Sequence, residues 1–354
     1  MKLLLTGSTG ALGAELLSSL ITRRSGDQIY VLLRASGPEE FATRSFNLLA
    51  SLDEDVRRRV TPIAGDVTAD QLGLGDHYCM MAGEIDEIFH AAACTKFDAG
   101  IEEAAASNIG GTRRVLDLAH RAQRYGKSGR FHYVSTAYVA GRRTGSVAED
   151  DLDCGQDFFN AYEWSKFKAE CEVQEAGRTL PVTIYRPSVV VGNSQTGWAK
   201  RFLGVYQVLR WIDRGQLNTL PCRADFELDI VPADYVANAI VALSELDASV
   251  GKTFHLTAGD NRLPIEELIK IFLHEREQRG REPRQAGGVR FESIHSLDGD
   301  PNATRLGPYV PYLNSPKAFD DGNTKSILKN FVSAPCREYF PRVVRYALDS
   351  EFRA

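Results

Sequence analysis

The chain has 354 residues, of which 43% are hydrophobic and 25% are charged, and this is enough for one large folded domain with a smaller module. Its formal net charge of -5 argues against nucleic-acid binding, which needs clustered Lys and Arg. The six cysteines lack the spacing of a metal site or a disulfide framework, so we expect no metal. No stretch reads as a signal peptide or a transmembrane segment, so we expect a cytoplasmic protein.

The first forty residues predict a βαβ unit: a strand at 2–5, a glycine turn at 6–10, a helix at 11–23 and a strand at 28–34. Further strands are expected at 60–63, 87–90, 130–135 and 181–185, and they alternate with helices such as 108–125 and 161–176. This alternation predicts the α/β class, as a Rossmann-type doubly wound parallel sheet with helices on both faces.

The alternation breaks after Gly192. We therefore expect a Rossmann domain over 1–192 and a smaller C-terminal substrate-binding lobe formed by 193–227 and 261–354. Between the two lobe segments, at about 228–260, a helix and a strand are expected again, which predicts that the chain returns there to the first domain.

The glycine turn reads Thr6-Gly7-Ser8-Thr9-Gly10-Ala11-Leu12-Gly13 and lies between the first strand and the first helix. In that position Gly7 and Gly10 let the backbone turn tightly and approach a pyrophosphate, which the helix N-terminus attracts. Gly13 lets the helix lie close to the sheet. We expect a dinucleotide to bind here, in contact with Gly7, Thr9, Gly10, Ala11 and Leu12.

The ends of the next strands suggest which dinucleotide binds. An acid that binds the ribose hydroxyl is usual after the second strand of an NAD enzyme, but this chain has Arg34, which suits a 2′-phosphate and favours NADPH. Arg44 is either a second phosphate ligand or an ordinary surface residue. Asp66, followed by Val67, is placed to meet the adenine, and the small Ala91 and Ala92 allow a close approach below the cofactor.

Three side chains form a candidate catalytic group. Tyr162 and Lys166 lie four residues apart, on one face of a predicted helix, and Thr136 follows the fifth strand. We expect the Lys166 ammonium to favour ionisation of Tyr162 and to hold the nicotinamide ribose. Thr136, with Ser135 as its substitute, would join Tyr162 in stabilising the substrate oxygen as a hydride arrives.

These motifs resemble the extended short-chain dehydrogenase/reductase superfamily. The likeness also rests on Asn108-Ile109-Gly110-Gly111-Thr112 and on Arg186-Pro187-Ser188, and it is strongest to the thioester reductase and fatty acyl-CoA reductase group. The resemblance covers roughly residues 1–260. It implies that Pro187 and Val189 flank the nicotinamide and that Tyr162 and Lys166 also contact the cofactor.

The same resemblance implies NADPH-dependent reduction of an acyl thioester, on coenzyme A or a separate carrier protein, to an aldehyde and then to an alcohol if a second hydride is delivered. The motifs alone leave two alternatives open. One is a hydroxysteroid-type or other extended dehydrogenase acting on a ketone, an aldehyde or a nucleotide sugar. The other is a regulator that binds NADP without turnover.

Overall fold

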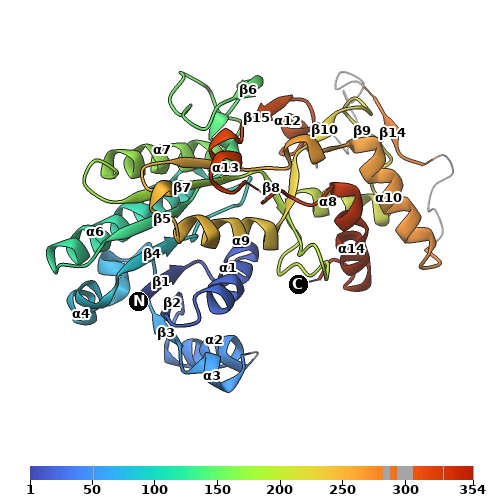
Figure 1. Cartoon of the computed structure of the whole chain (residues 1–354). Helices are drawn as coiled ribbons and strands as arrows, with labels where there is room; N and C mark the ends of the chain where they lie inside the picture. Colours follow the sequence, from blue (N-terminus) through green and yellow to red (C-terminus); the bar gives the residue numbers. More distant parts are fainter. Residues whose placement is uncertain (51, 282–287, 293–305, 330, 354) are drawn as a thin grey trace.

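A seven-stranded parallel sheet forms the centre of the computed structural model, which describes residues 1–50, 52–281, 288–292, 306–329 and 331–353 (Figure 1). The strand order is β12-β7-β5-β4-β1-β2-β3. The strands are β1 (Lys2–Thr6), β2 (Gln28–Leu33), β3 (Val60–Ala64), β4 (Glu87–His90), β5 (Arg130–Val134), β7 (Val182–Pro187) and β12 (Thr253–Leu256). The sheet confirms the predicted α/β, Rossmann-type fold.

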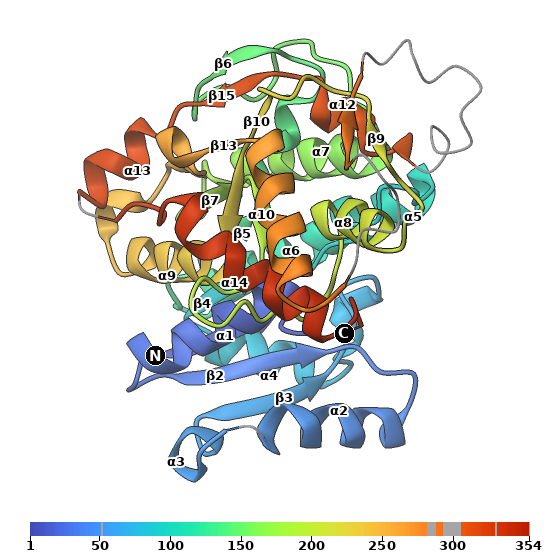
Figure 2. The same ribbon diagram turned by 90° about the vertical axis from the view of Figure 1, so that its right-hand side faces the viewer.

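Helices cover both faces of this sheet, which is why most residues of its central strands are buried. One face carries α1 (Ala11–Arg23), α2 (Pro38–Ala50) and α9 (Ala233–Ser244), and the other carries α4 (His77–Glu84), α6 (Gly111–Arg124) and α7 (Ala161–Ala176). Figure 2 shows α2 and β3 at the edge of the sheet, far from the C-terminal helices. Each face thus has its own hydrophobic core.

Some boundaries differ from those expected. The helix expected at 108–125 begins as a π-helical segment, η2 (Ala105–Gly110), and continues as α6. The strand expected at 181–185 extends to Pro187, so Arg186 lies within β7 and its side chain is fully buried. Within the segment 228–260, α9 packs on the sheet and β12 pairs with β7.

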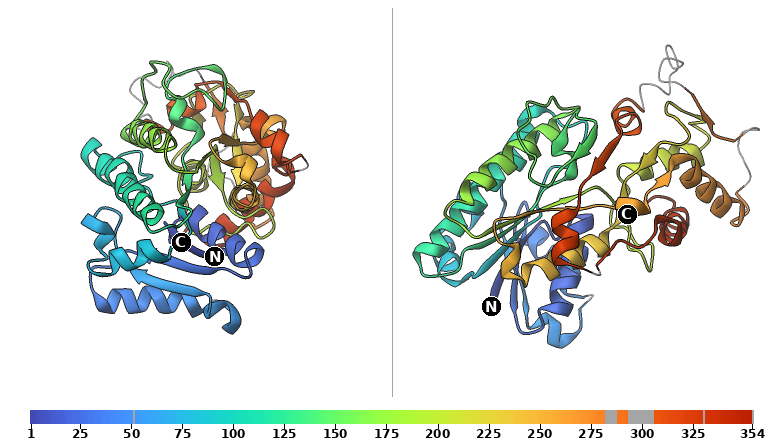
Figure 3. Two further views of the ribbon diagram at one scale, coloured as in Figure 1. Left: turned by 60° about the vertical axis from the view of Figure 1, so that its left-hand side comes forward. Right: turned by 45° about the horizontal axis from the view of Figure 1, so that its top comes forward.

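A third hydrophobic core lies beyond the carboxyl end of the sheet. It is formed mainly by α8 (Val205–Asp213), α10 (Ile265–Glu277) and α14 (Cys336–Asp349). Figure 3 shows α10 and α14, coloured orange and dark red, side by side and set apart from the first helices of the chain. The proposed lobe boundaries include 282–287 and 293–305, which lie outside the described residues, so the division into domains stays a prediction.

Short elements complete the described part of the chain. Four two-stranded sheets pair β6 (Gly145–Val147) with β15 (Lys317–Phe319), β8 (Val189–Val191) with β11 (Ile230–Pro232), β9 (Thr219–Leu220) with β14 (Arg290–Phe291), and β10 (Glu227–Leu228) with β13 (Leu263–Pro264). The short helices are α3 (Glu54–Arg57), η1 (Asp70–Gly73), α5 (Ile101–Ala104), η3 (Ala137–Ala140), η4 (Asp247–Ser249), η5 (Gly259–Asn261), α12 (Val310–Leu313) and α13 (Gly322–Ile327). Among the described helices, none combines the length and the apolar character that crossing a membrane requires.

Candidate active site

One large cavity, of about 820 Å³, lies at the carboxyl ends of β1 to β5 and extends to α8, α10 and α12. All the residues predicted from the sequence to bind the cofactor or to act in catalysis line this cavity. They are Gly7, Thr9, Gly10, Ala11, Leu12, Arg34, Arg44, Asp66, Val67, Ala91, Ala92, Thr136, Tyr162, Lys166, Pro187 and Val189. The fold therefore brings together residues that lie far apart in the chain, from Gly7 to Val189.

The glycine turn is built by close backbone contacts. Gly7 has a φ of +81°, and a Cβ there would lie 2.5 Å from both the Ala91 carbonyl carbon and the Ala92 nitrogen. A Cβ on Gly13 would lie 2.0 Å from the Gly7 oxygen. The turn therefore tolerates only glycine at these two positions. Helix α1 approaches the turn closely at Gly13, as expected. At Gly7 the close neighbour is the backbone of Ala91 and Ala92.

The polar residues at the nucleotide end differ in how they are held. Among the described residues Arg34 has no salt-bridge partner, whereas the Arg44 guanidinium lies 2.5 Å from a Glu40 carboxylate oxygen. One Asp66 oxygen accepts hydrogen bonds of 2.8 Å from the Thr68 backbone N–H and from its hydroxyl. Of the two arginines expected from the sequence, Arg34 is thus the one without a salt-bridge partner in the described chain.

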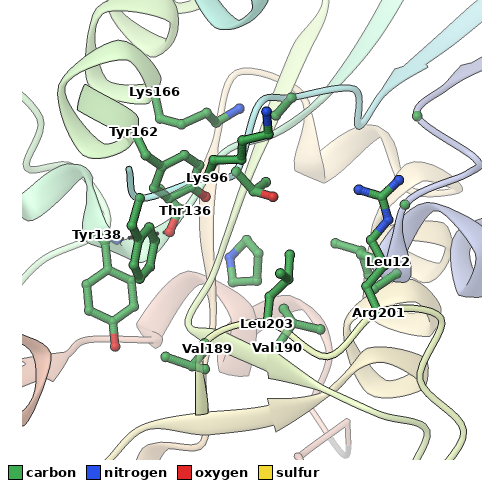
Figure 4. Close-up of a pocket in the computed structure, with 18 of the residues that line it drawn as sticks. Leu12, Lys96, Thr136, Tyr138, Tyr162, Lys166, Val189, Val190, Arg201 and Leu203 are labelled. Carbon is green, nitrogen blue, oxygen red and sulfur yellow. Dashed lines mark hydrogen bonds between the residues drawn. The ribbon is translucent and has the colours of Figure 1, made fainter. Parts of the chain in front are cut away.

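The catalytic candidates come from β5 and α7. The side chain of Asn160 caps α7 by accepting from the Glu163 N–H at 3.0 Å, which fixes the first turn of the helix that carries Tyr162. Thr136 lies two residues after the end of β5, and its side chain accepts from the Tyr138 N–H at 3.2 Å. Figure 4 shows Tyr162 and Lys166 projecting from α7 beside Thr136. Burial raises the pKa of Tyr162 to about 12, and a hydrogen bond with Thr136 opposes this effect.

The prediction that the Lys166 ammonium favours ionisation of Tyr162 is wrong for this structure. The Lys166 ammonium donates instead to the Tyr133 hydroxyl at 2.8 Å and to the Val134 carbonyl at 2.7 Å. Lys166 is only 2% exposed, and burial lowers its pKa to about 7. Desolvation is therefore the main cause of the pKa shift of both side chains. It keeps Tyr162 protonated at neutral pH rather than favouring its ionisation.

Ser135, the substitute for Thr136, is engaged elsewhere. Its hydroxyl donates to the Glu170 carboxylate, which also accepts from the Arg186 guanidinium at 2.5 and 2.9 Å. Glu170 and Arg186 are both fully buried. These bonds tie β5, α7 and β7 together behind the cavity, and Thr136 rather than Ser135 lies beside Tyr162.

The sequence did not identify the residues at the far end of the cavity. An aromatic group lies beside Tyr162: the Phe97 ring lies 5.9 Å from the Tyr162 ring, and the Tyr312 ring stacks on Phe97 at 5.0 Å. Other lining residues are mostly apolar and include Tyr138, Leu203, Val205, Val208, Leu209, Trp211, Leu228, Ile265, Leu268, Ile269, Tyr309 and Leu313. Two further cations line the cavity, Lys96 and Arg201, and Figure 4 shows Arg201 beside Leu12 of the glycine turn. The amphipathic pattern of residues 205–213 was the signal in the sequence that could have identified one wall of this end.

Comparisons with known proteins show the family of this chain. A family model described as male sterility protein matches residues 5–240, which is more than half of the chain. The chain belongs to the male sterility protein family. It is an NAD(P)-binding oxidoreductase of the extended short-chain dehydrogenase/reductase superfamily, in the thioester reductase and fatty acyl-CoA reductase group, as its motifs indicated.

Individual relatives of this family are moderately similar. A linear gramicidin synthase protein of Brevibacillus parabrevis is 32% identical over 277 residues, which are 75% of this chain and 5% of the synthase protein. The fatty acyl-CoA reductase wat of Drosophila melanogaster is 27% identical over 273 residues, or 67% of this chain and 53% of that protein. This chain therefore spans about half or less of these relatives.

Solved structures support the same group. The terminal R domain from the myxalamid PKS-NRPS biosynthetic pathway superposes with a TM-score of 0.81 at 29% identity, covering 99% of this chain and 91% of that domain. UDP-glucuronic acid 4-epimerase from Bacillus cereus, in complex with NAD, has a TM-score of 0.70 at 17% identity, covering 99% of this chain and 97% of that one. The epimerase shares the fold alone.

Proposed function

We propose that this protein is an NADPH-dependent reductase of acyl thioesters, which it converts to aldehydes. The observation that carries this proposal is the continuous cavity. At one end it has a glycine turn, at its centre Thr136, Tyr162 and Lys166, and at its far end an apolar and aromatic lining. Such a cavity can hold a nucleotide and an acyl chain at once, with the reacting carbonyl between them.

The residues present fit NADPH. Among the described residues no side chain caps the N-terminus of α1, so its first backbone N–H groups are available to a pyrophosphate. Arg34, without a carboxylate partner in the described chain, supplies a guanidinium for the 2′-phosphate at the carboxyl end of β2. Bound NADPH supplies the hydride.

The catalytic residues favour reduction. Because Tyr162 keeps its proton at neutral pH, it acts as the proton donor to the carbonyl oxygen. Thr136, beside it, donates a second hydrogen bond to that oxygen, and the two hydroxyls stabilise the negative charge that develops there. Lys166 binds the nicotinamide ribose. Hydride addition and protonation give a hemithioacetal. Its C–S bond then breaks, the hydroxyl proton passes to the sulfur, and the thiol and the aldehyde are released.

The far end of the cavity favours an uncharged acyl group. Leu209, Leu268 and Ile269 are buried there, and burial of apolar substrate against them is favourable by about 25 cal/mol per Å². The relative named as a fatty acyl-CoA reductase fits this class of substrate. The thiol carrier is either coenzyme A or a carrier protein.

The test is NADPH oxidation by the purified protein with decanoyl-CoA, with a decanoyl-loaded carrier protein and with free decanal, each with products identified by mass spectrometry. We expect oxidation with a thioester and formation of decanal, and the ratio of alcohol to aldehyde gives the number of hydrides delivered. Activity on decanal alone would overturn the thioester assignment.

Tyr162→Phe keeps the ring but not the proton donor. Its rate should be lower by about 100-fold or more, and it should bind NADPH normally.

A further inference from the structure

The Lys166 ammonium is held by two consecutive residues of β5. Its nitrogen donates to the Tyr133 hydroxyl and the Val134 carbonyl, and it also lies 4.2 Å from the centre of the Tyr133 ring. An ammonium has three N–H donors arranged as a tripod. With two of them directed to β5, the direction of the third is fixed, and that donor remains for a ligand in the cavity that Lys166 lines.

Tyr133 is in turn held from the other side. It is fully buried, and its hydroxyl also hydrogen-bonds the Thr112 side chain. The Thr112 hydroxyl lies 3.1 Å from His90 Nε2, and His90 Nδ1 lies 2.7 Å from the Thr6 hydroxyl. These side chains come from β5, α6, β4 and β1, and they form a continuous buried network that runs from Lys166 to the glycine turn.

The network is polar but need carry no charge beyond that of Lys166. Burial and the nearby Lys166 lower the pKa of His90 to about 3, so His90 is neutral. A neutral imidazole has one donor and one acceptor nitrogen, so His90 donates to one of its two threonine hydroxyls and accepts from the other. Each hydroxyl and each ring nitrogen thereby has a partner, which a buried polar group requires.

We propose that Tyr133 is the positioning residue of Lys166, and that Thr112 and His90 hold the Tyr133 hydroxyl in the orientation that accepts from the ammonium. This inference rests on the role of Lys166 in the proposed function. Tyr133 touches neither cofactor nor substrate in this assignment. It acts by fixing the direction of the remaining Lys166 N–H and by stabilising the charged form of the amine.

Several charged or titratable groups face Lys166. Glu170 and Tyr162 lie on its own helix α7, Tyr133 on β5 and His90 on β4, while Arg186 of β7 neutralises Glu170. Of these, only Tyr133 has a hydrogen bond to the amine that can be removed without changing a charge. Loss of that bond should therefore lower the pKa of Lys166 further, and the other groups stay as they are.

The test compares Tyr133→Phe with Tyr185→Phe. Tyr185 is equally buried, but its hydroxyl bonds His132 at 3.0 Å, so its variant loses a buried hydroxyl away from Lys166. NADPH affinity, followed by fluorescence, and kcat with the thioester are measured between pH 5.5 and 9. We expect Tyr133→Phe to shift the pH at which NADPH affinity falls by about one unit downward and to lower kcat by about tenfold. Tyr185→Phe should keep the wild-type midpoint.

A midpoint that is unchanged in Tyr133→Phe, or shifted equally in Tyr185→Phe, would overturn the inference. If Tyr133→Phe does not fold, Thr112→Val and Thr112→Ser replace it: Val should shift the midpoint in the same direction by a smaller amount, and Ser should restore it. Identical Val and Ser profiles would also overturn the inference. NADPH binding needs no turnover, so these results are independent of the thioester assignment, which fails only if the wild type reduces no thioester.

Discussion

Burial acts in opposite directions on the two titratable side chains at the centre of the site. It raises the pKa of Tyr162 to about 12 and lowers that of Lys166 to about 7. In both cases desolvation disfavours the charged form. Over the neutral range Tyr162 therefore stays a proton donor, and Lys166 is the side chain of the pair whose charge changes.

NADPH affinity should consequently depend on pH. The ammonium of Lys166 is present below its pKa of about 7 and is lost above it, so affinity should fall as the pH rises through about 7. The cofactor phosphate, with a second pKa near ~6, stays ionised above that range. A fluorescence titration from pH 6.5 to 9 measures this. Lys166→Met, of similar length but without charge, should remove the dependence, and its persistence in that variant would assign it to another group.

Arg34 should decide between the two nicotinamide cofactors. Its guanidinium lines the nucleotide end of the cavity, and a charge-assisted hydrogen bond to the 2′-phosphate contributes about 1.5–3 kcal/mol. Arg34→Ala should therefore weaken NADPH binding by about 10- to 100-fold and leave NADH binding nearly unchanged. Arg44→Ala is the control, with a smaller effect because Arg44 is paired with Glu40. Equal losses for NADPH and NADH would refute the phosphate contact.

Helix α7 is attached to the sheet by charges as well as by packing. The Glu170 carboxylate on α7 binds Arg186 of β7 and Ser135 after β5, and the ion pair is fully buried. On the exposed side of the same helix Glu172 pairs with Arg113, whose side chain is 65% exposed. The two ion pairs differ mainly in burial. Comparing variants of the two pairs therefore measures how much burial adds to the contribution of an ion pair to stability.

Glu170→Gln should destabilise the protein by about 3 kcal/mol, because it leaves the Arg186 charge buried without a counter-ion. Glu172→Gln should cost less than about 1 kcal/mol, as expected for a solvated pair. Urea unfolding of both variants, followed by circular dichroism, gives the two free energies. If the two losses are equal, the buried pair does not anchor α7 to β7.

The molecule as a whole places its cavity between two kinds of surface. The carboxyl ends of the strands supply polar backbone and the catalytic hydroxyls, whereas α8, α10 and α12 supply apolar side chains. Leu203, just before α8, is 49% exposed and yet lines the cavity (Figure 4). It is therefore a position where the substrate side of the cavity can be changed without disturbing the core.

Leu203→Glu should raise the KM for an apolar acyl thioester by about tenfold, since a carboxylate beside the acyl chain must lose its hydration, and it should leave NADPH affinity unchanged. Leu246→Glu is the matched control, because Leu246 is 38% exposed and does not line the cavity. Steady-state kinetics with decanoyl-CoA measures both variants. A KM that is unchanged in Leu203→Glu would place the acyl chain elsewhere.

The glycine turn, the strands and the Thr136, Tyr162 and Lys166 group were predictable because each depends on neighbours close in sequence. Gly7 lies at a strand-to-helix junction, and Tyr162 and Lys166 are one helical turn apart. Strand polarity then places all the strand ends at one edge of the sheet. These local patterns were sufficient to predict the fold class and every cavity residue named from the sequence.

The surroundings of these residues could not be predicted in this way. Tyr133 lies in β5, next to its last residue, but that position does not say that its hydroxyl meets Lys166. The aromatic contacts of Phe97 with Tyr309 and Tyr312 join residues more than 200 positions apart. Sequence periodicity shows which side of an element is buried but not what is packed against it. The partner of Lys166, the direction of the two pKa shifts and the apolar end of the cavity therefore depend on tertiary packing.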